Sequence, residues 1–116
     1  MIKIWHNPKC SKSKAVLALL EKNNCETQVV EYLENVPSTS EIKDVLSMLN
    51  INARGLMRVK EDLYKELNLS DSSLSQDDLI KAMTDNPKLI ERPVVIKDGQ
   101  AAIGRPIENI IELIKE

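Results

Sequence analysis

Several features that would assign this sequence to a large functional class are missing from its 116 residues. The net charge is −2, so the chain lacks the concentrated basic face that binds nucleic acid or anionic membranes. No apolar run approaches the ~20 residues of a membrane span. The N-terminal residues lack the layout of a signal peptide. We therefore expect a cytoplasmic protein with no nucleic-acid partner and no membrane partner.

Cysteine and histidine are scarce, with two cysteines and one histidine. A predicted helix over residues 11–23 separates Cys10 from Cys25 by ~20 Å, at ~1.5 Å per residue. A disulfide needs Cα atoms within ~7 Å, so we expect two free thiols in a reducing compartment. One histidine and two separated cysteines also do not make a metal site, and no bound cofactor is expected.

Aliphatic residues, in contrast, are plentiful. The sequence is 42% hydrophobic but only 3% aromatic, which predicts an aliphatic core that needs no disulfide or metal. A length of 116 residues fits one domain. We expect a single domain over residues 1–116 and, by default, a monomer.

The first third of the chain has the pattern of a strand, a helix and a second strand. Residues 2–5 alternate apolar and polar, residues 11–23 have helical periodicity, and residues 27–32 are rich in β-branched and aromatic types. Such a series predicts a βαβ unit with parallel strands and a right-handed crossover.

The middle of the chain, about residues 38–86, carries helical signals only. Ser38 with Glu41 and Ser75 with Asp78 have the spacing of capping boxes at helix starts. Residues 53–67 continue with helical periodicity, and the charged residues Lys60-Glu61-Asp62 and Lys65-Glu66 are typical of a solvated helix face.

The last third predicts a hairpin and a helix. A strand over 93–97, a tight turn at Asp98-Gly99 and a return strand over 100–103 precede a helix that starts at Arg105-Pro106. The whole is an α/β protein in which a βαβ half and a ββα half form a thioredoxin-like fold, with a helical insertion (about 38–86) between the halves.

Cys10 stands between a predicted strand and a predicted helix. The N–H groups and positive dipole end of a helix N-terminus favour a thiolate and attract an oxyanion, and lysines at 9, 12 and 14 add positive charge. A small buried residue at a strand end is the alternative, but the preceding Pro8 and the cationic surroundings favour a nucleophile. Ser13, three residues on, cannot form a disulfide, so an oxidised Cys10 needs an external thiol. Ser13 either donates a hydrogen bond to the thiolate or faces solvent.

Other polar residues are candidates for the same site. His6 either supports the thiolate as a cation or proton carrier, or is a loop residue without a role. Arg92 and Arg105 each precede a proline at an element junction, and guanidinium groups suit bidentate oxyanion binding, although an arginine of this kind taken alone is more often a surface residue. Pro93 at the head of a strand permits a cis peptide.

Five motifs together resemble the glutaredoxin-coupled arsenate reductase family, in register over essentially the whole chain. They are His-Asn-Pro-Lys-Cys-Ser-Lys-Ser-Lys at 6–14, Tyr-Leu-Glu-Asn-Val-Pro at 32–37, Gly-Leu-Met-Arg at 55–58, Glu-Arg-Pro-Val-Val-Ile at 91–96 and Gly-Arg-Pro-Ile-Glu at 104–108. The Cys-Ser-Lys-Ser loop resembles one branch of that family. The resemblance implies that Cys10 is the nucleophile and that three residues bind the arsenate oxygens: Arg58, Arg92 and Arg105. It also implies glutathione as co-substrate and glutaredoxin as partner.

Two other functions stay open for the same fold. A redox-responsive regulator that binds RNA polymerase typically carries Cys-x-x-Cys and lacks the full arginine trio, so Ser13 and Arg105 argue against it. A monothiol glutathione-dependent thiol transferase would use Cys10 alone. Cys25 is expected to pack at a helix–strand junction, and Arg54 has no assigned role.

Overall fold

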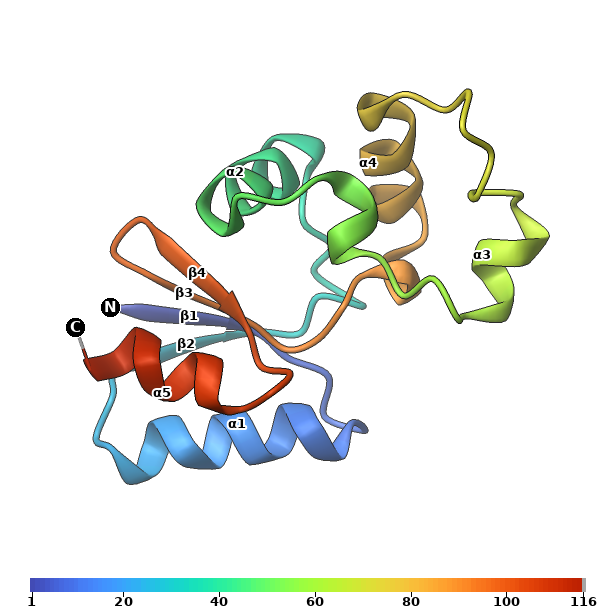
Figure 1. Cartoon of the computed structure of the whole chain (residues 1–116). Coiled ribbons are helices and arrows are strands. Elements are labelled where there is room, and N and C mark those ends of the chain that lie inside the picture. Colours follow the sequence, from blue (N-terminus) through green and yellow to red (C-terminus); the bar gives the residue numbers. More distant parts are fainter. Residues whose placement is uncertain (116) are drawn as a thin grey trace. The chain divides into compact units, whose positions relative to one another are not determined.

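The computed structural model describes residues 1–115, and the chain in it divides into two compact units (Figure 1). The first unit comprises residues 1–35 and the residues from 92 onward, and the second comprises residues 36–91. The expectation of a single domain over the whole chain stays a prediction. None of the described helices is both long enough and apolar enough to cross a membrane.

The first unit is a mixed four-stranded sheet with two helices. The strand order is β2-β1-β3-β4, in which β1 and β2 are parallel while β3 is antiparallel to both β1 and β4. This is the βαβ and ββα arrangement of a thioredoxin-like fold, as predicted. The elements are β1 (Ile2–Trp5), α1 (Ser11–Lys22), β2 (Thr27–Val30), β3 (Val94–Lys97), β4 (Gln100–Ile103) and α5 (Glu108–Lys115).

Both helices of this unit pack on one face of the sheet, where α1 and α5 run side by side (Figure 1). The core between them is aliphatic, as the low aromatic content predicted, and its burial removes apolar surface of both layers from water. Its buried members are Ile2, Ile4, Val16, Leu20, Val95, Ile110 and Leu113.

The C-terminal hairpin forms where it was predicted, and the last helix begins later. Asp98 and Gly99 both have positive φ, of 48° and 80°, which is the backbone of a two-residue hairpin turn. The helix α5 begins at Glu108 rather than at Arg105-Pro106. The carbonyl of Pro106 accepts from Asn109 N–H, three residues on, whereas the carbonyl of Ile107 accepts the α-helical bond from Ile111 N–H. The Arg92–Pro93 peptide is cis, as the position of Pro93 allowed.

The second unit is helical, as expected for the middle of the chain. Both predicted capping boxes are present: Ser38 Oγ accepts from Glu41 N–H at 3.1 Å, and Ser75 Oγ accepts from Asp78 N–H at 3.1 Å. The elements are α2 (Thr39–Leu49), the 3-10 helix η1 (Ala53–Leu56), α3 (Asp62–Glu66), α4 (Gln76–Asp85) and the 3-10 helix η2 (Pro87–Leu89).

The prediction of continuous helical structure over 53–67 is wrong. The 3-10 helix η1 ends at Leu56, and Met57 then forms an antiparallel bridge with Ile90. Arg58 N–H donates to Leu89 O at 2.7 Å on the same pairing. Of the apolar side chains that suggested a helix, Leu56, Met57 and Tyr64 are buried. The backbone at Met57 and Arg58 nevertheless pairs with a distant segment instead of continuing a helix.

Candidate functional site

Cys10 is the N-cap residue of α1. A turn places it there: Cys10 N–H donates to Asn7 O at 3.0 Å, and Lys9 N–H donates to Asn7 Oδ1 at 3.0 Å. Cys10 has extended backbone (φ −99°, ψ 121°), and its carbonyl accepts the helical bond from Lys14 N–H. The sulfur is therefore carried at the N-terminal end of the helix, as the sequence pattern predicted.

This position makes the thiol more acidic. Burial raises the pKa of Cys10, but hydrogen bonds from the backbone N–H groups of Ser13 and Lys12, together with the Arg92 guanidinium, lower it by more. The net result is a pKa below the ordinary value of a thiol. The thiolate is the nucleophilic form, so this environment favours reactivity.

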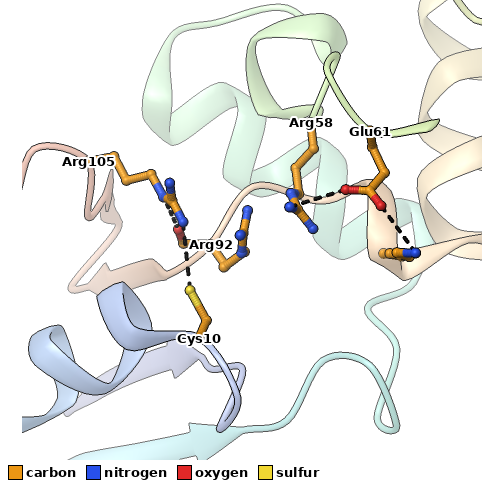
Figure 2. A network of polar contacts seen from close by, with 6 residues as sticks. Cys10, Arg58, Glu61, Arg92 and Arg105 are labelled. Carbon is orange, nitrogen blue, oxygen red and sulfur yellow. Dashed lines mark hydrogen bonds and ion pairs between the residues drawn. The ribbon is translucent and has the colours of Figure 1, made fainter. Parts of the chain in front are cut away.

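Two arginines contact the sulfur from the C-terminal part of the chain. Arg105 Nη2 donates to Cys10 Sγ at 3.6 Å, and Arg105 Nε donates to the backbone carbonyl of Arg92 at 3.0 Å (Figure 2). The Arg92 side chain also hydrogen-bonds Cys10. Two of the three predicted oxyanion-binding arginines thus contact the Cys10 side chain.

The register of the sheet explains why these segments meet. Trp5 pairs with Val94, and Val94 pairs with Ile103, so three strand ends lie in one row. The Cys10 loop follows the first, Arg92 precedes the second and Arg105 follows the third. Residues far apart in the sequence are brought together by strand pairing alone.

Gly104 sits at the tightest point of this junction and was not singled out by the sequence. Its N–H donates to Pro93 O at 2.9 Å. A Cβ atom at this residue would lie 2.8 Å from both Pro93 Cγ and Val16 Cγ2, a distance that real Cβ contacts do not show. Its place directly before Arg105 in the Gly-Arg-Pro motif was the available signal, because glycine is needed where backbone approaches closely.

His6 and Ser13 form a buried pair beneath the Cys10 loop. Ser13 Oγ lies 2.6 Å from His6 Nδ1 and accepts from Asn7 N–H at 3.0 Å. It is therefore the backbone N–H of Ser13 that lies at the sulfur, while its hydroxyl is engaged with the loop. The pKa of His6 is lowered by burial, against the raising effect of Glu31 and with a further lowering by Lys14. The lowered pKa favours a neutral imidazole, which contacts Ser13 Oγ next to the Cys10 loop.

Arg58 belongs to the second unit, where a carboxylate holds it. Arg58 Nη2 lies 3.1 Å from Glu61 Oε2, and the other oxygen of Glu61 lies 3.1 Å from Lys88 Nζ (Figure 2). The Glu61 side chain is only 15% exposed, so the expectation of a solvated helix face is wrong at this residue. Its neighbours in sequence are charged and exposed, so the sequence pattern gave no sign that Glu61 is buried.

The remaining candidate residues make contacts of a structural kind. Arg54 Nη2 donates to the carbonyls of Leu69 and Asp71, at 3.1 and 2.8 Å, and so fastens the loop that follows α3. Cys25 packs against the core of the first unit between α1 and β2, as predicted, and both cysteines are free thiols. Among residues 1–115 no cluster of three or more potential metal ligands is found.

Comparisons with known proteins cover nearly the whole chain. The model of the ArsC family matches residues 5–113. The uncharacterized protein YfgD of Escherichia coli strain K12 is 56% identical over 97% of this chain and 96% of its own. An arsenate reductase of Neisseria meningitidis is 54% identical over 94% of each chain. The solved structure of an arsenate reductase from Vibrio cholerae is 54% identical, covers 96% of this chain and 95% of its own, and superposes with a TM-score of 0.93.

Proposed function

Because the chain belongs to the ArsC family, as its motifs predicted, we propose that it reduces arsenate to arsenite with Cys10 as the nucleophile. Glutathione is the co-substrate and glutaredoxin the partner in this proposal, and no cofactor stays bound. The observation that carries it is the contact of Arg105 Nη2 with Cys10 Sγ at 3.6 Å, beside the Arg92 side chain.

Electrostatics supports this chemistry. A thiolate that attacks an arsenate anion must overcome charge repulsion, which fixed positive groups reduce most effectively when they are already in place. Arg92 and Arg105 are such groups, and the N–H groups at the start of α1 add a third positive contribution. The family resemblance assigns Arg58 to the same oxyanion.

The proposed reaction balances with two external thiols. Cys10 sulfur replaces one hydroxyl of arsenate, which leaves as water, and glutathione replaces a second hydroxyl in the same way. The glutaredoxin thiol then attacks the glutathione sulfur, and the S–As bond breaks with its electron pair left on arsenic, which becomes As(III). A glutaredoxin–glutathione disulfide forms, and water displaces Cys10 to release arsenite.

One thiol at the site matches this scheme. Ser13 occupies the position where a second cysteine would close an internal disulfide, so the electrons come from outside the chain. A protein that depends on glutathione works in a reducing compartment, and we propose a cytoplasmic monomer.

The test is a coupled assay that follows NADPH oxidation with arsenate, glutathione, glutaredoxin and glutathione reductase. Activity is expected for the wild type and for Cys25→Ser, the matched control, and no activity is expected for Cys10→Ser. Absence of arsenate-dependent oxidation by the wild type would refute the proposal. In that event, deglutathionylation that survives Arg105→Ala would favour a thiol transferase, and binding to the polymerase α subunit would favour a regulator.

A further inference from the structure

A cavity of about 450 Å³ lies in the first unit beside the Cys10 loop. One wall is the N-terminal part of α1, with Ser11, Lys12 and Ala15, and the other wall is the segment over 104–108 that leads into α5. Such a volume falls within the ~300–1,000 Å³ range of sites for small molecules.

The cavity borders both segments that carry the candidate reactive groups. Ser11 adjoins Cys10 in the chain, and Gly104 and Pro106 stand on either side of Arg105. Arg105 Nη2 and Cys10 Sγ are 3.6 Å apart. The cavity is thus lined by sequence neighbours of Cys10 and Arg105, while Cys10, Arg92 and Arg105 do not line it themselves.

The charges of the cavity indicate a zwitterion. Lys12 lines it from the helix side and Glu108 from the opposite wall, both are exposed, and neither forms an ion pair within residues 1–115. Between them lie apolar groups of Ala15, Pro106 and Ile107. A carboxylate on one wall and an aliphatic lining are poor surroundings for arsenate, which carries only negative charge and has no apolar part.

We propose that this cavity binds the small thiol that attacks the arsenic held on Cys10, a zwitterionic thiol peptide of the glutathione type. Lys12 pairs with a carboxylate of the peptide, Glu108 pairs with its ammonium group, and its methylene groups lie on the apolar lining. The chemistry that follows binding rests on the proposed function. In that step an S–As bond forms, one arsenic-bound hydroxyl leaves as water with the thiol proton, and arsenic remains As(V).

The test measures binding without turnover. S-methylglutathione has the charges of glutathione but no reactive thiol, so it neither forms disulfides nor attacks arsenic. Titrated into the full-length protein, it is expected to shift the amide resonances of residues 11–15 and 104–108. Glu108→Lys should weaken its binding about 3- to 10-fold, as loss and reversal of an exposed charge contact predicts.

A second variant fills the cavity, and each variant has a matched control. Ala15→Trp is expected to weaken binding by about 10-fold or more, whereas Ala18→Trp, an exposed alanine of α1 that does not line the cavity, should bind as the wild type does. Glu112→Lys on α5 is the control for Glu108→Lys. In turnover, the ratio of the rate with glutathione to the rate with 2-mercaptoethanol should fall for Ala15→Trp.

The two proposals fail in different ways. Shifts elsewhere, or equal binding by Ala15→Trp and Ala18→Trp in folded proteins, would overturn the thiol site and leave arsenate reduction standing. Binding at the cavity in a protein that does not turn over arsenate would instead keep the site and refute the proposed function.

Discussion

Arg105 and Cys10 are ninety-five positions apart in the sequence, and a hydrogen bond of 3.6 Å from guanidinium to sulfur joins them. A second hydrogen bond fixes the position of the same guanidinium, because its Nε donates to the carbonyl of Arg92 at 3.0 Å. Its planar fork thus uses one edge to fix its orientation and another to meet the sulfur, which lysine could not do with a single ammonium.

The acidity of the Cys10 thiol should depend on Arg92. The Arg92 guanidinium is one of the groups that lower the pKa of Cys10 against the raising effect of burial. Arg92→Ala is therefore expected to raise this pKa and to move the pH at which the thiol becomes reactive upward. The rate of alkylation by iodoacetamide, measured against pH in a Cys25→Ser background, reports Cys10 alone.

Arg54→Ala is the control for this titration, because Arg54 binds backbone carbonyls in the second unit. An Arg92→Ala profile that coincides with that of Arg54→Ala and of the parent would show that the backbone N–H groups of α1 account for the acidity without Arg92.

Gly104 should be intolerant of even one methyl group. A Cβ would lie 2.8 Å from both Val16 Cγ2 and Pro93 Cγ, and overpacking of this kind costs about 1–3 kcal/mol. Gly104→Ala is expected to lower the free energy of unfolding by that amount and to reduce turnover, since the next residue is Arg105. Urea denaturation measures the first effect and the coupled assay the second.

A double variant separates steric crowding from other causes. Val16→Ala removes one of the two clashing groups, so Val16→Ala with Gly104→Ala should be less destabilised than the sum of the single variants. Additive losses would mean that the clash with Val16 is not the origin of the effect.

Local signals in the sequence were sufficient for much of the fold. The capping boxes at Ser38 and Ser75 and the Asp98-Gly99 turn are each specified within four residues, and each formed as predicted. The pairing of Met57 with Ile90 has no local signal, because apolar periodicity reports burial and not the partner of the backbone. The continuous helix expected over 53–67 failed for that reason.

The same distinction, between local signals and long-range pairing, applies to the candidate site. Cys10 at a helix N-terminus follows from neighbouring residues and was predicted from them. The convergence of Arg92 and Arg105 on its sulfur needs the strand order β2-β1-β3-β4, which periodicity does not contain. The burial of Glu61 was not predicted, because its neighbours in sequence are charged and exposed. Its carboxylate is buried only because Arg58 and Lys88 lie against it in the folded chain.

Glu61 should act as a positioning residue for Arg58. Its carboxylate is shared between Arg58 Nη2 and Lys88 Nζ, each at 3.1 Å. Glu61→Gln keeps the shape but removes the charge, so the Arg58 side chain gains rotamer freedom. Because we propose that Arg58 binds the oxyanion, the expected result is a rise of about 3- to 10-fold in the KM for arsenate with a smaller change in kcat, as the loss of one fixed charged contact predicts.

The pH dependence of alkylation distinguishes this role from a general loss of structure, since the Cys10 profile should stay as in the parent. Asp62→Asn is the matched control, because Asp62 is the adjacent acid and has no ion pair among the described residues. An equal rise in KM for both variants would contradict a specific role for Glu61.

Acidification should destabilise the protein through His6. Its folded-state pKa is lowered, chiefly by burial, so the unfolded chain takes up a proton more readily than the folded protein does. The stability from the neutral imidazole is therefore complete above the unfolded value of ~6.5 and is lost as the pH falls toward the folded pKa. His6→Asn keeps an acceptor near Ser13 Oγ but does not titrate, so its free energy of unfolding should vary less with pH between ~7.5 and ~5.

Urea denaturation across this range measures how the free energy of unfolding varies with pH for each protein. Both proteins carry Cys10→Ser, which removes the thiol titration. Parallel slopes for the two proteins would show that His6 titrates alike in the folded and unfolded chains.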